Sequence, residues 1–561
     1  MISNRSFFLL LGLCLLAAIM GMVMIPLMDI DASQYASISR EMLENHSYLQ
    51  VFDLKQDYLD KPPMLFWLSA FSMKIFGVHD WSYRLPSFLF AILAVYATFK
   101  LAFLFYERTI AQLAALVLAS SQAMFLITHD VRCDTMLMGW VALSLWQLAA
   151  WYQTKSWKHF LLGFVAIAGG MMTKGPIALL VPAFAFAPHF ILRRQWMQLL
   201  RWEYLLGLLI IGILLVPMSI GLYQQFDMHP GKLINGVPIK SGLRFYYWTQ
   251  SFGRYTGENR FNEMNSFSFL LENMLWSFLP WILLFLLALV MEIIAIIKKK
   301  FKLASTEEWI SVGGFILTYC ALARSQAQLP HYIFVVFPLA AIVTGKFLFK
   351  LLYTPEWEKW RKPLLVIHAC IFTLLWIAVV VLMEWPFESI PKVVGGFAAL
   401  CMVVFLLAPF SIRLRIPKLI TIAVFTAFGV NFFMNTFFYP SVLQYQLGND
   451  AAAFMNEQHI NKDELAVYGI HEGRALHFYA QHIFSEKASA QDFQAGSMVL
   501  TSKDSIPVFQ RSFPALRVLH EGPAFGVTAL SLPFLNPATR DKEVPKYVII
   551  DLDGKPPITS H

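Results

Sequence analysis

Carboxylates that could do chemistry stand in short polar stretches between long apolar runs. Asp29 and Asp31 come directly after the first apolar run, at residues 7–28. A carboxylate in this place can cap the end of a helix, or it can act as a general base that takes a proton from an acceptor hydroxyl. The spacing alone does not choose between the two residues.

Basic residues that could hold an anionic leaving group occur in later polar stretches. Lys61 stands between Asp60 and two prolines, and Lys174 precedes Gly-Pro between two apolar runs. Lys174 can reach water along its own stem, or it can pair with an acid. Arg254 lies in an aromatic-rich loop that could also be an interfacial belt. Lysine and arginine side chains of this kind would suit a phosphate or pyrophosphate.

Two further connectors carry polar side chains. The connector at 129–134 ends in Asp134, and the connector at 324–332 ends in His331 and Tyr332. The sequence has no HExxH, P-loop, GxGxxG or paired CxxC motif, so zinc hydrolysis, ATP-driven transport and dinucleotide chemistry lose support.

The elements that position these residues must be membrane helices. The chain has 561 residues, of which 57% are hydrophobic and only 14% are charged. Soluble domains carry about 25% charged residues, so a polytopic α-helical membrane protein is expected. The net charge of +8 does not indicate nucleic acid, because the basic residues stand mainly in connectors between apolar runs.

Thirteen runs are apolar enough to be candidate spans, since a helix needs about 20 residues to cross a bilayer. They lie near residues 7–28, 84–106, 109–127, 135–152, 159–173, 176–192, 204–222, 271–297, 308–323, 330–352, 363–383, 393–410 and 419–439. Met64–Phe76 is short for a span and is expected to be a helix in the membrane interface.

The basic connectors also predict an orientation. With the N-terminus inside, clusters such as Lys298–Lys300 all fall inside, as the positive-inside rule expects. The loops 29–83 and 223–270 and the C-terminus then lie outside. Residues 1–440 would form the membrane domain. Residues 441–561, with strand-like runs at 465–470, 497–501 and 547–550, would form a small extracytoplasmic α/β domain.

Several motifs resemble those of a known family. Asp31-Ala-Ser-Gln-Tyr35-Ala-Ser-Ile-Ser-Arg40-Glu-Met-Leu is similar to the D-E-x-x-Y-A-x-I-S-R-E-M-L signature of bacterial lipid A aminoarabinose transferases. Asp60-Lys61-Pro62 is similar to the family's E-K-P, and Met172-Thr173-Lys174-Gly175 matches its M-T-K-G. Gln328-Leu-Pro-x-Tyr332 resembles K-L-P-x-Y, and the segment from Gln250 to Arg254 resembles one that ends in R-F. These enzymes belong to the GT-C glycosyltransferases, as do the protein O-mannosyltransferases.

The resemblance implies roles for individual residues. Asp31 would be the catalytic carboxylate. Lys61, Arg254 and Tyr332 would surround the donor phosphate, and Asp60 and Asp134 would shape the site. Tyr35, Arg40 and Lys174 stand at further motif positions. The chain departs from the family at Ala32, where the signature has Glu, and at Gln328, where it has Lys. These departures leave the acceptor and the sugar open.

The function expected on these grounds is an inverting glycosyltransferase of the bacterial inner membrane. Its donor would be a polyprenyl-phosphate-linked sugar, and its acceptor would be lipid A, another glycan or a protein. Membrane lipids would be partners and nucleic acid would not. No cofactor is expected to be required, and a divalent metal stays an open question. The alternative is a transporter or flippase for an anionic lipid-linked sugar, which would need alternating access.

Overall fold

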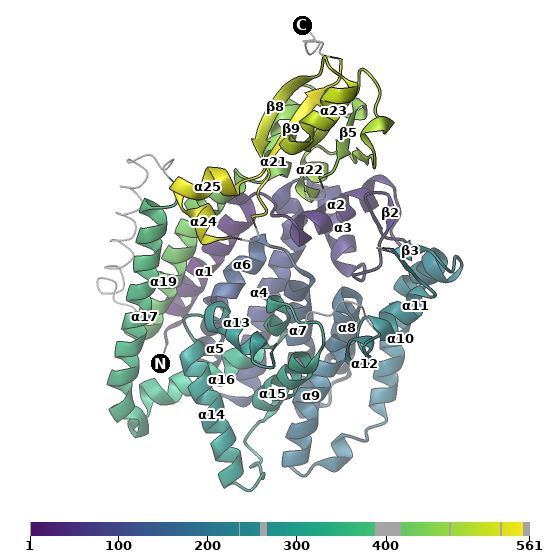
Figure 1. Ribbon diagram of the computed structural model, residues 1–561. Helices are drawn as coiled ribbons and strands as arrows, with labels where there is room; N and C mark the ends of the chain where they lie inside the picture. Colours follow the sequence, from purple (N-terminus) through teal and green to yellow (C-terminus); the bar gives the residue numbers. More distant parts are fainter. Residues whose placement is uncertain are drawn as a thin grey trace.

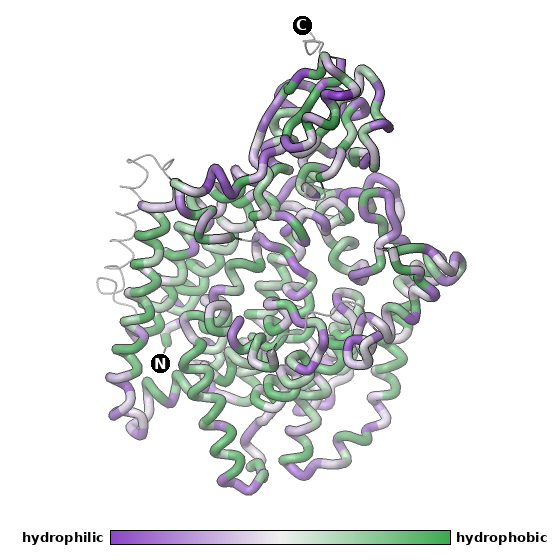
Figure 2. Tube along the Cα trace, in the orientation of Figure 1, coloured by the Kyte–Doolittle hydropathy of each residue, from purple (hydrophilic) through white to green (hydrophobic). Residues whose placement is uncertain are grey.

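A computed structural model describes residues 2–234, 236–258, 266–387, 417–470, 473–527 and 530–553. Long helices form the body of the molecule, and a smaller α/β part lies above them (Figure 1). Hydrophobic residues fill the long helices, whereas hydrophilic residues gather in the upper part and at the lower helix ends (Figure 2). Polar and apolar residues are therefore separated in layers.

The helical body is built from a series of mostly apolar helices. In chain order they are α1 (Asn4–Met24), α4 (Asp80–Phe105), α5 (Arg108–Ala119), α6 (Gln122–His129), α7 (Cys133–Thr154), α8 (Trp157–Lys174), α9 (Ile177–Leu192), α10 (Glu203–Leu222), α13 (Phe269–Ser277), α14 (Ile282–Lys298), α15 (Ile310–Arg324), α16 (Phe337–Tyr353), α17 (Glu358–Glu384) and α19 (Lys418–Phe433).

Many apolar side chains of this body face outward. On α10, Leu205, Leu209 and Ile213 are 70%, 58% and 60% exposed. Water would disfavour so many exposed leucines on one helix, whereas lipid would not, because lipid tails are themselves apolar. The outward face of α10 is therefore suited to lipid.

Six helices in the described part of the chain are long and apolar enough to cross a membrane. They are Asn4–Met24, Asp80–Phe105, Trp196–Asp227, Pro330–Tyr353, Pro355–Glu384 and Lys418–Leu443. The helices α5 and α6 would make a seventh span if they are counted together, since they meet at a bend of 52°. The body is thus a multi-span helical membrane fold.

The predicted spans fall on helices wherever the structure describes them. The run at 109–127 covers the bent pair α5 and α6, and the run at 271–297 covers the broken pair α13 and α14. The run at 393–410 lies outside the described residues. The total of thirteen spans stays a prediction, because several of these helices are shorter than a bilayer requires.

The two long loops hold short elements. The first loop holds α2 (Asp31–Glu44), β1 (Phe52–Asp53), β2 (Gln56–Asp57) and α3 (Met64–Phe76), so the helix predicted at Met64–Phe76 is present. The second loop holds β3 (Leu233–Ile234), β4 (Val237–Pro238), α11 (Gly242–Arg244) and α12 (Gly253–Thr256).

A five-stranded sheet forms the centre of the upper part. Its strand order is β6-β5-β7-β9-β8, and β5 runs parallel to both β6 and β7, whereas β9 runs antiparallel to β7 and β8. The strands are β5 (Leu465–Tyr468), β6 (Ser485–Glu486), β7 (Met498–Ser502), β8 (Arg517–Pro523) and β9 (Lys546–Asp551). The three predicted strand-like runs are therefore strands, while the domain boundary at residue 440 stays a prediction.

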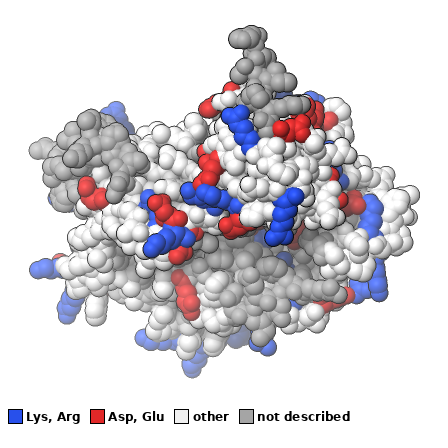
Figure 3. Space-filling view, turned by 45° about the horizontal axis from the view of Figure 1, so that its top comes forward, with Lys and Arg blue, Asp and Glu red and all other residues white. Residues whose placement is uncertain are grey.

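Helices cover the sheet and join it to the body. They are α20 (Tyr439–Leu443), α21 (Leu447–Glu457), α22 (Arg474–Tyr479), α23 (Ile506–Ser512), α24 (Leu532–Leu535) and α25 (Pro537–Glu543). In the space-filling view, side chains of both charge signs are mixed on the upper part, and Lys and Arg gather along the lower edge (Figure 3). This distribution agrees with an upper part that faces water.

Candidate active site

A buried arginine positions the chain that leads to Asp31. Arg84, near the start of α4, is fully buried. Its Nη1 donates to the carbonyl oxygens of Met22 (3.1 Å) and Ile25 (2.5 Å) at the end of α1, and its Nε donates to the carbonyl of His129 (3.0 Å) at the end of α6. The last carbonyls of a helix lack partners within the helix. One guanidinium therefore joins the two helix ends from which Asp31 and Arg132 follow.

Asp31 lies in an ion-pair cluster with two residues of the connector between α6 and α7. Arg132 donates through Nη1 to Asp31 Oδ2 and through Nε to Asp130 Oδ2, the latter at 3.0 Å. The side chain of Asp31 is 34% exposed and that of Asp130 is 13% exposed. Burial of Arg132 disfavours its charge, but the carboxylates of Asp130 and Asp31 outweigh burial and raise its pKa. The guanidinium thus holds one oxygen of Asp31.

Lys61 and Asp60 form a second cluster in the first long loop. The Lys61 ammonium lies 2.5 Å from Asp60 Oδ2. The amide of Gln250, from the second long loop, donates to Asp60 Oδ1 and to the Asp60 carbonyl, both at 2.9 Å. Two loops that are about 190 residues apart in the chain are joined at this point.

Both partners of this pair are charged over a wide pH range. Burial opposes ionisation of Asp60, but the Lys61 ammonium, helped by the Gln250 amide, outweighs burial and lowers the pKa of Asp60. Burial likewise favours neutral Lys61, but the Asp60 carboxylate outweighs burial and raises the pKa of Lys61. Neither residue is therefore suited to exchange protons near neutral pH.

Arg254, Tyr332 and Lys174 form the opposite side of the same region. Arg254 Nη1 donates to the Tyr332 hydroxyl at 3.1 Å, and the Lys174 ammonium lies 3.8 Å from the centre of the Tyr332 ring. Tyr332 belongs to the 3₁₀ segment Pro330–Val336 that precedes α16. One tyrosine thus contacts two cations, through its hydroxyl and through its ring face.

Lys174 and Arg254 differ in whether a carboxylate lies at ion-pair distance. Lys174 lies 2.5 Å from Asp134 Oδ1, and His331 Nε2 lies 3.6 Å from the other oxygen of Asp134. Within the described residues, Arg254 has no carboxylate at ion-pair distance, and its Nε is buried without a hydrogen-bond partner. Arg254 is therefore the cation best able to accept a bound anion.

These side chains line one cavity of about 100 Å³. Its polar lining includes Asp60, Lys61, Asp134, Lys174, Gln250, Arg254 and Tyr332, and its apolar lining includes Leu137, Ile177, Leu180, Leu322 and Val335. Three cations against two carboxylates leave an excess of one positive charge. A phosphate with an apolar tail would meet complementary surroundings here.

Three of the predicted site residues lie outside this cavity. Asp31 is in the Arg132 cluster. Tyr35 is 3% exposed and packs edge-to-face on Phe66 at 5.8 Å between ring centres, and Arg40 is 1% exposed and pairs with Glu44 at 3.0 Å. In this structure Tyr35 and Arg40 pack α2 against its surroundings. In the described part of the chain, the Nε and Nη2 of Arg40 are buried without a hydrogen-bond partner, and a role of Tyr35 and Arg40 in the site stays a prediction.

Sequence reasoning assigned no role to Arg132 or Arg84. Arg132 stands in the predicted polar connector, but its pairing with Asp31 across about 100 residues leaves no local pattern. Arg84 opens a predicted span, where snorkelling toward water would be expected. The sequence signal for this cluster is the charged pair Asp130 and Arg132, shortly before the predicted span at 135–152.

Comparisons with known proteins agree with these features. The family model described as "Dolichyl-phosphate-mannose-protein mannosyltransferase" matches residues 60–220. The undecaprenyl phosphate-α-4-amino-4-deoxy-L-arabinose arabinosyl transferase of Enterobacter sp. strain 638 is 26% identical over 401 residues, which are 69% of this chain and 67% of that protein. The undecaprenyl phosphate-α-4-amino-4-deoxy-L-arabinose arabinosyl transferase 1 of Pseudomonas fluorescens (strain Pf0-1) is 25% identical over 328 residues, which are 56% of this chain and 53% of that protein.

The fold matches solved structures over nearly the whole chain. ArnT from Cupriavidus metallidurans bound to undecaprenyl phosphate superimposes with a TM-score of 0.74 at 19% identity, covering 99% of this chain and 100% of that one. The apo form gives a TM-score of 0.73 at 18% identity, covering 98% of each chain. The chain is thus a multi-pass membrane protein with the GT-C fold, and its resemblance to lipid A aminoarabinose transferases is confirmed.

Proposed function

We propose that the chain is a glycosyltransferase that moves a sugar from a polyprenyl-phosphate donor to an acceptor outside the membrane. The observation that carries this proposal is the cavity in which Lys61, Lys174 and Arg254 meet apolar walls. The named activity of the sequence relatives supports the same enzyme class.

The donor would bind with its phosphate among the three cations. Arg254 has a buried, unpaired Nε within the described residues, and Tyr332 fixes its Nη1. Asp60 and Asp134 hold the two lysines in place and reduce the cost of burying their charge. The polyprenyl tail would lie along the apolar lining supplied by α7, α9 and α15.

Asp31 would act on the acceptor. Its carboxylate takes the proton of the acceptor hydroxyl, and the oxygen attacks the anomeric carbon of the sugar. The bond between that carbon and the phosphate oxygen breaks, and polyprenyl phosphate leaves with the bonding electrons. The three cations stabilise the charge that develops on the leaving phosphate. Attack from the side opposite to the phosphate inverts the anomeric configuration.

The orientation of the chain belongs to this proposal. The lower edge rich in Lys and Arg would face the cytoplasm, and the loops 29–83 and 223–270 and the sheet would face outward from the inner membrane (Figure 3). Reporter fusions test it: a reporter at Lys299 should behave as cytoplasmic, and a reporter after Asp553 should behave as external. An external signal at Lys299 would contradict the orientation.

No cofactor is proposed for the reaction. The described residues hold no group of three or more His, Cys, Asp or Glu side chains placed to bind a metal ion. Metal dependence is settled by assaying transfer before and after dialysis against a chelator. Unchanged activity is expected, and activity that returns only with added divalent metal would contradict this part of the proposal.

Mass spectrometry of lipid A, other surface glycans and membrane proteins tests the function directly. Cells that make the chain should carry a sugar on one of these acceptors, and cells that make Asp31→Asn should lack it while the purified variant still binds undecaprenyl phosphate. A transporter would instead move its lipid equally well with either residue at position 31. Identical surfaces with and without the chain would refute the proposed transfer.

A further inference from the structure

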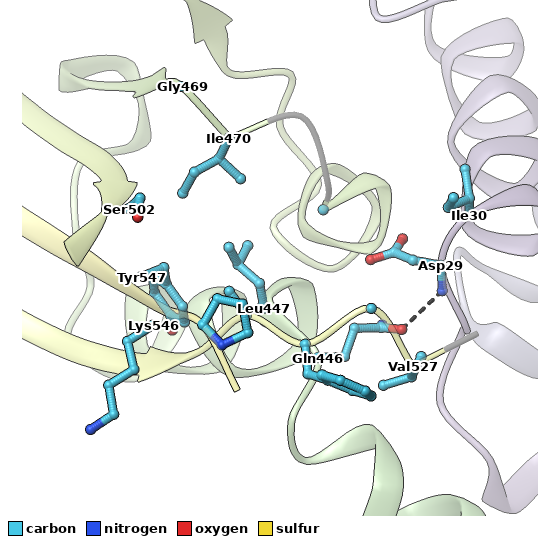
Figure 4. A pocket seen from close by; sticks show the side chains of 15 residues that line it. Asp29, Ile30, Gln446, Leu447, Gly469, Ile470, Ser502, Val527, Lys546 and Tyr547 are labelled. Carbon is cyan, nitrogen blue, oxygen red and sulfur yellow. Dashed lines mark hydrogen bonds between the residues drawn. The ribbon is translucent and has the colours of Figure 1, made fainter. Parts of the chain in front are cut away.

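A second cavity lies between the segment before α2 and the sheet. Its volume is about 190 Å³. Figure 4 shows Asp29 on one side of it and Ile470 and Ser502 on the other. Its one cation among the described lining residues is Lys546, whose ammonium pairs with Glu521 at 2.9 Å. The described lining therefore offers an anionic ligand no unpaired cation.

A group of three cations lies at the lower ends of the helices, on the opposite side of the molecule from the sheet. Lys155 follows the last residue of α7, and Arg193 and Arg201 stand in the link between α9 and α10. This link lies at the foot of the helical body (Figure 1). None of the three residues, here named the lower cation group, lines the donor cavity or the cavity beside the sheet.

Two aromatic side chains of α7 hold the lower cation group together. The Lys155 ammonium lies 5.7 Å from the centre of the Trp151 ring and 5.0 Å from the centre of the Tyr152 ring. The Arg201 guanidinium lies 4.8 Å from the centre of the Trp151 ring. Arg193 Nη1 donates to the Tyr152 hydroxyl at 3.1 Å. Because Trp151 is buried, the fold fixes where these cations lie around it.

Positive charge is in excess in the lower cation group. Arg201 pairs with Glu203, with Arg201 Nε 3.2 Å from Glu203 Oε2. Within the residues that the structure describes, neither Lys155 nor Arg193 has a carboxylate at ion-pair distance. Partial burial and the nearby Arg201 guanidinium lower the pKa of Lys155, because like charges repel each other. A bound anion would relieve this repulsion.

Large apolar side chains beside the lower cation group face outward. Met197 and Leu200 in the link are 75% and 78% exposed. Trp157 and Trp202 are 53% and 64% exposed, and the centres of their rings lie 6.3 Å apart. This surface continues along the chain into the outward face of α10, which is suited to lipid. An apolar medium, and not water, is therefore expected to cover it.

The length of the helical run places the link at the membrane surface. The run Trp196–Asp227 has 32 residues, which as a helix would span about 48 Å, whereas the hydrocarbon core of a bilayer is about 30 Å thick. Part of the run must therefore lie outside the core. At its lower end that part is the link, whose Trp196 and Trp202 side chains suit the level of the lipid headgroups.

An anionic lipid satisfies both features of this surface. Its phosphate can accept hydrogen bonds from lysine and arginine, and its acyl chains can cover the exposed Met197 and Leu200. A free phosphate would leave these apolar side chains in water. An apolar surface of a second copy of the chain would leave Lys155 and Arg193 without a counter-charge, which costs free energy when they are desolvated.

We propose that Lys155, Arg193 and Arg201 bind the phosphate headgroup of an anionic phospholipid in the leaflet at the lower helix ends. The bound lipid neutralises the excess charge and joins the end of α7 to the link between α9 and α10. This site is separate from the donor cavity, and the inference does not depend on the proposed transfer of a sugar.

Charge variants at Lys155 test the proposal, because this side chain is exposed. Lys155→Gln removes the charge, and Lys155→Arg keeps it. Lys302→Gln is the matched control, since Lys302 is an exposed lysine of the basic connector 298–302 after α14 and lies outside the lower cation group. A general attraction between the basic connectors and anionic lipid would respond equally to Lys155→Gln and Lys302→Gln.

Native mass spectrometry of the purified chain measures bound phosphatidylglycerol over a concentration series, with phosphatidylcholine as the neutral lipid. We expect the wild-type chain, Lys155→Arg and Lys302→Gln to bind phosphatidylglycerol with similar affinity and in preference to phosphatidylcholine. Lys155→Gln should bind phosphatidylglycerol about fivefold more weakly, which is the contribution of one cation near an anionic headgroup. Thermal unfolding in phosphatidylcholine shows whether each variant is folded.

Four results would overturn the inference: equal binding of the two lipids by the wild-type chain, unchanged phosphatidylglycerol affinity in Lys155→Gln, an equal loss in Lys302→Gln, or displacement of the lipid by inorganic phosphate at the same concentration. Dimers in place of bound lipid would overturn it too, and would assign the exposed tryptophans to a second copy of the chain. If Lys155→Gln does not fold, Arg193→Gln decides by the same readout.

Discussion

The two cavities of this chain differ in charge more than in size. The cavity in the helical body gathers three cations around Tyr332, and its walls are apolar. The cavity below the sheet holds the Asp29 carboxylate and one lysine that is paired with Glu521. Lys61, Lys174 and Arg254 come from loops and helix ends of the membrane fold, whereas the other cavity needs the sheet. The difference teaches that a group of cations suited to a phosphate is built from the membrane fold alone, whereas the sheet encloses a cavity of another character.

The largest expected effect is at Asp31. Asp31→Asn keeps size and most hydrogen bonding but removes the base, so transfer should fall by about 10²–10⁴-fold, the usual contribution of general base catalysis. Undecaprenyl phosphate affinity should stay within about twofold, because Asp31 does not line the donor cavity. Transfer assays and a binding titration on the same preparation measure both quantities.

The control for this variant is Glu457→Gln at the end of α21. Glu457 is exposed, so its loss should change little. Asp29→Asn is a poorer control, because Asp29 is buried and holds both Ser33 and the Ala475 N–H. Full transfer by Asp31→Asn would remove the acid–base mechanism and favour the transporter alternative.

The next largest effect is on donor affinity, and it should differ between the cations of the two cavities. Lys61→Ala and Arg254→Ala each remove a cation from a buried phosphate site, which costs about 2–5 kcal/mol, or about 30-fold or more in donor affinity. Lys546→Ala removes a cation from the edge of the other cavity and should leave donor affinity unchanged. Titrations with undecaprenyl phosphate measure all three. Equal losses of donor affinity in the three variants would show that the two cavities do not differ in phosphate binding.

A smaller effect is expected at Arg132, which acts through Asp31. Arg132→Gln should lower transfer by about tenfold, because the Asp31 carboxylate loses the guanidinium that positions it. The same change made in Asp31→Asn should cost nothing further, since the interaction is already removed. The transfer rates of the wild-type chain, the two single variants and the double variant distinguish a positioning role of Arg132 from a general loss of folding. Losses that multiply in the double variant would show that Arg132 does not act through Asp31.

The smallest effect concerns pH. The pKa of Asp60 is lowered in the folded protein. Its contribution to folding stability is therefore complete above its unfolded pKa of about 4 and is lost as pH falls through the lower folded value. The pKa of Lys61 is raised, so its contribution to folding stability is complete below its unfolded pKa of about 10.4 and is lost as pH rises through the higher folded value. Between these limits the pair should not titrate.

Undecaprenyl phosphate affinity should therefore change only a few-fold between about pH 5 and pH 8, with a midpoint near 6 from the ligand's own second proton. Binding titrations at several pH values check this. A second midpoint that disappears in Asp60→Asn would show that the pair does titrate in this range.

Sequence patterns predicted the membrane fold because its signal is local. Each apolar run in the described residues lies on a helix, and the strand runs of the upper part are strands. Lys61, Lys174, Arg254 and Tyr332 each stand in a recognisable motif, and the structure brings them to one cavity. Their role at a donor phosphate stays a prediction. The resemblance to the transferase family, built on those motifs, is borne out by the sequence relatives and by the ArnT fold.

The rest depends on contacts between distant segments. The Arg132–Asp31 pair and the Asp29–Ala475 bond join residues about 100 and 450 positions apart, and no periodicity records them. Tyr35 and Arg40 show another case, since their motif is strong but neither side chain lines the cavity of the helical body. The second cavity forms only when the sheet closes over the first long loop, so no single stretch of sequence encodes it.

An experimental structure with bound undecaprenyl phosphate tests the central claim most directly. The claim is that the phosphate binds in the cavity of the helical body, among Lys61, Lys174 and Arg254. The account predicts density for the phosphate within hydrogen-bond reach of Lys61, Arg254 and Tyr332, with the tail along α9 and α15 and the cavity beside Ile470 empty of lipid. A phosphate bound beside Asp29 and Ser502 would contradict the account.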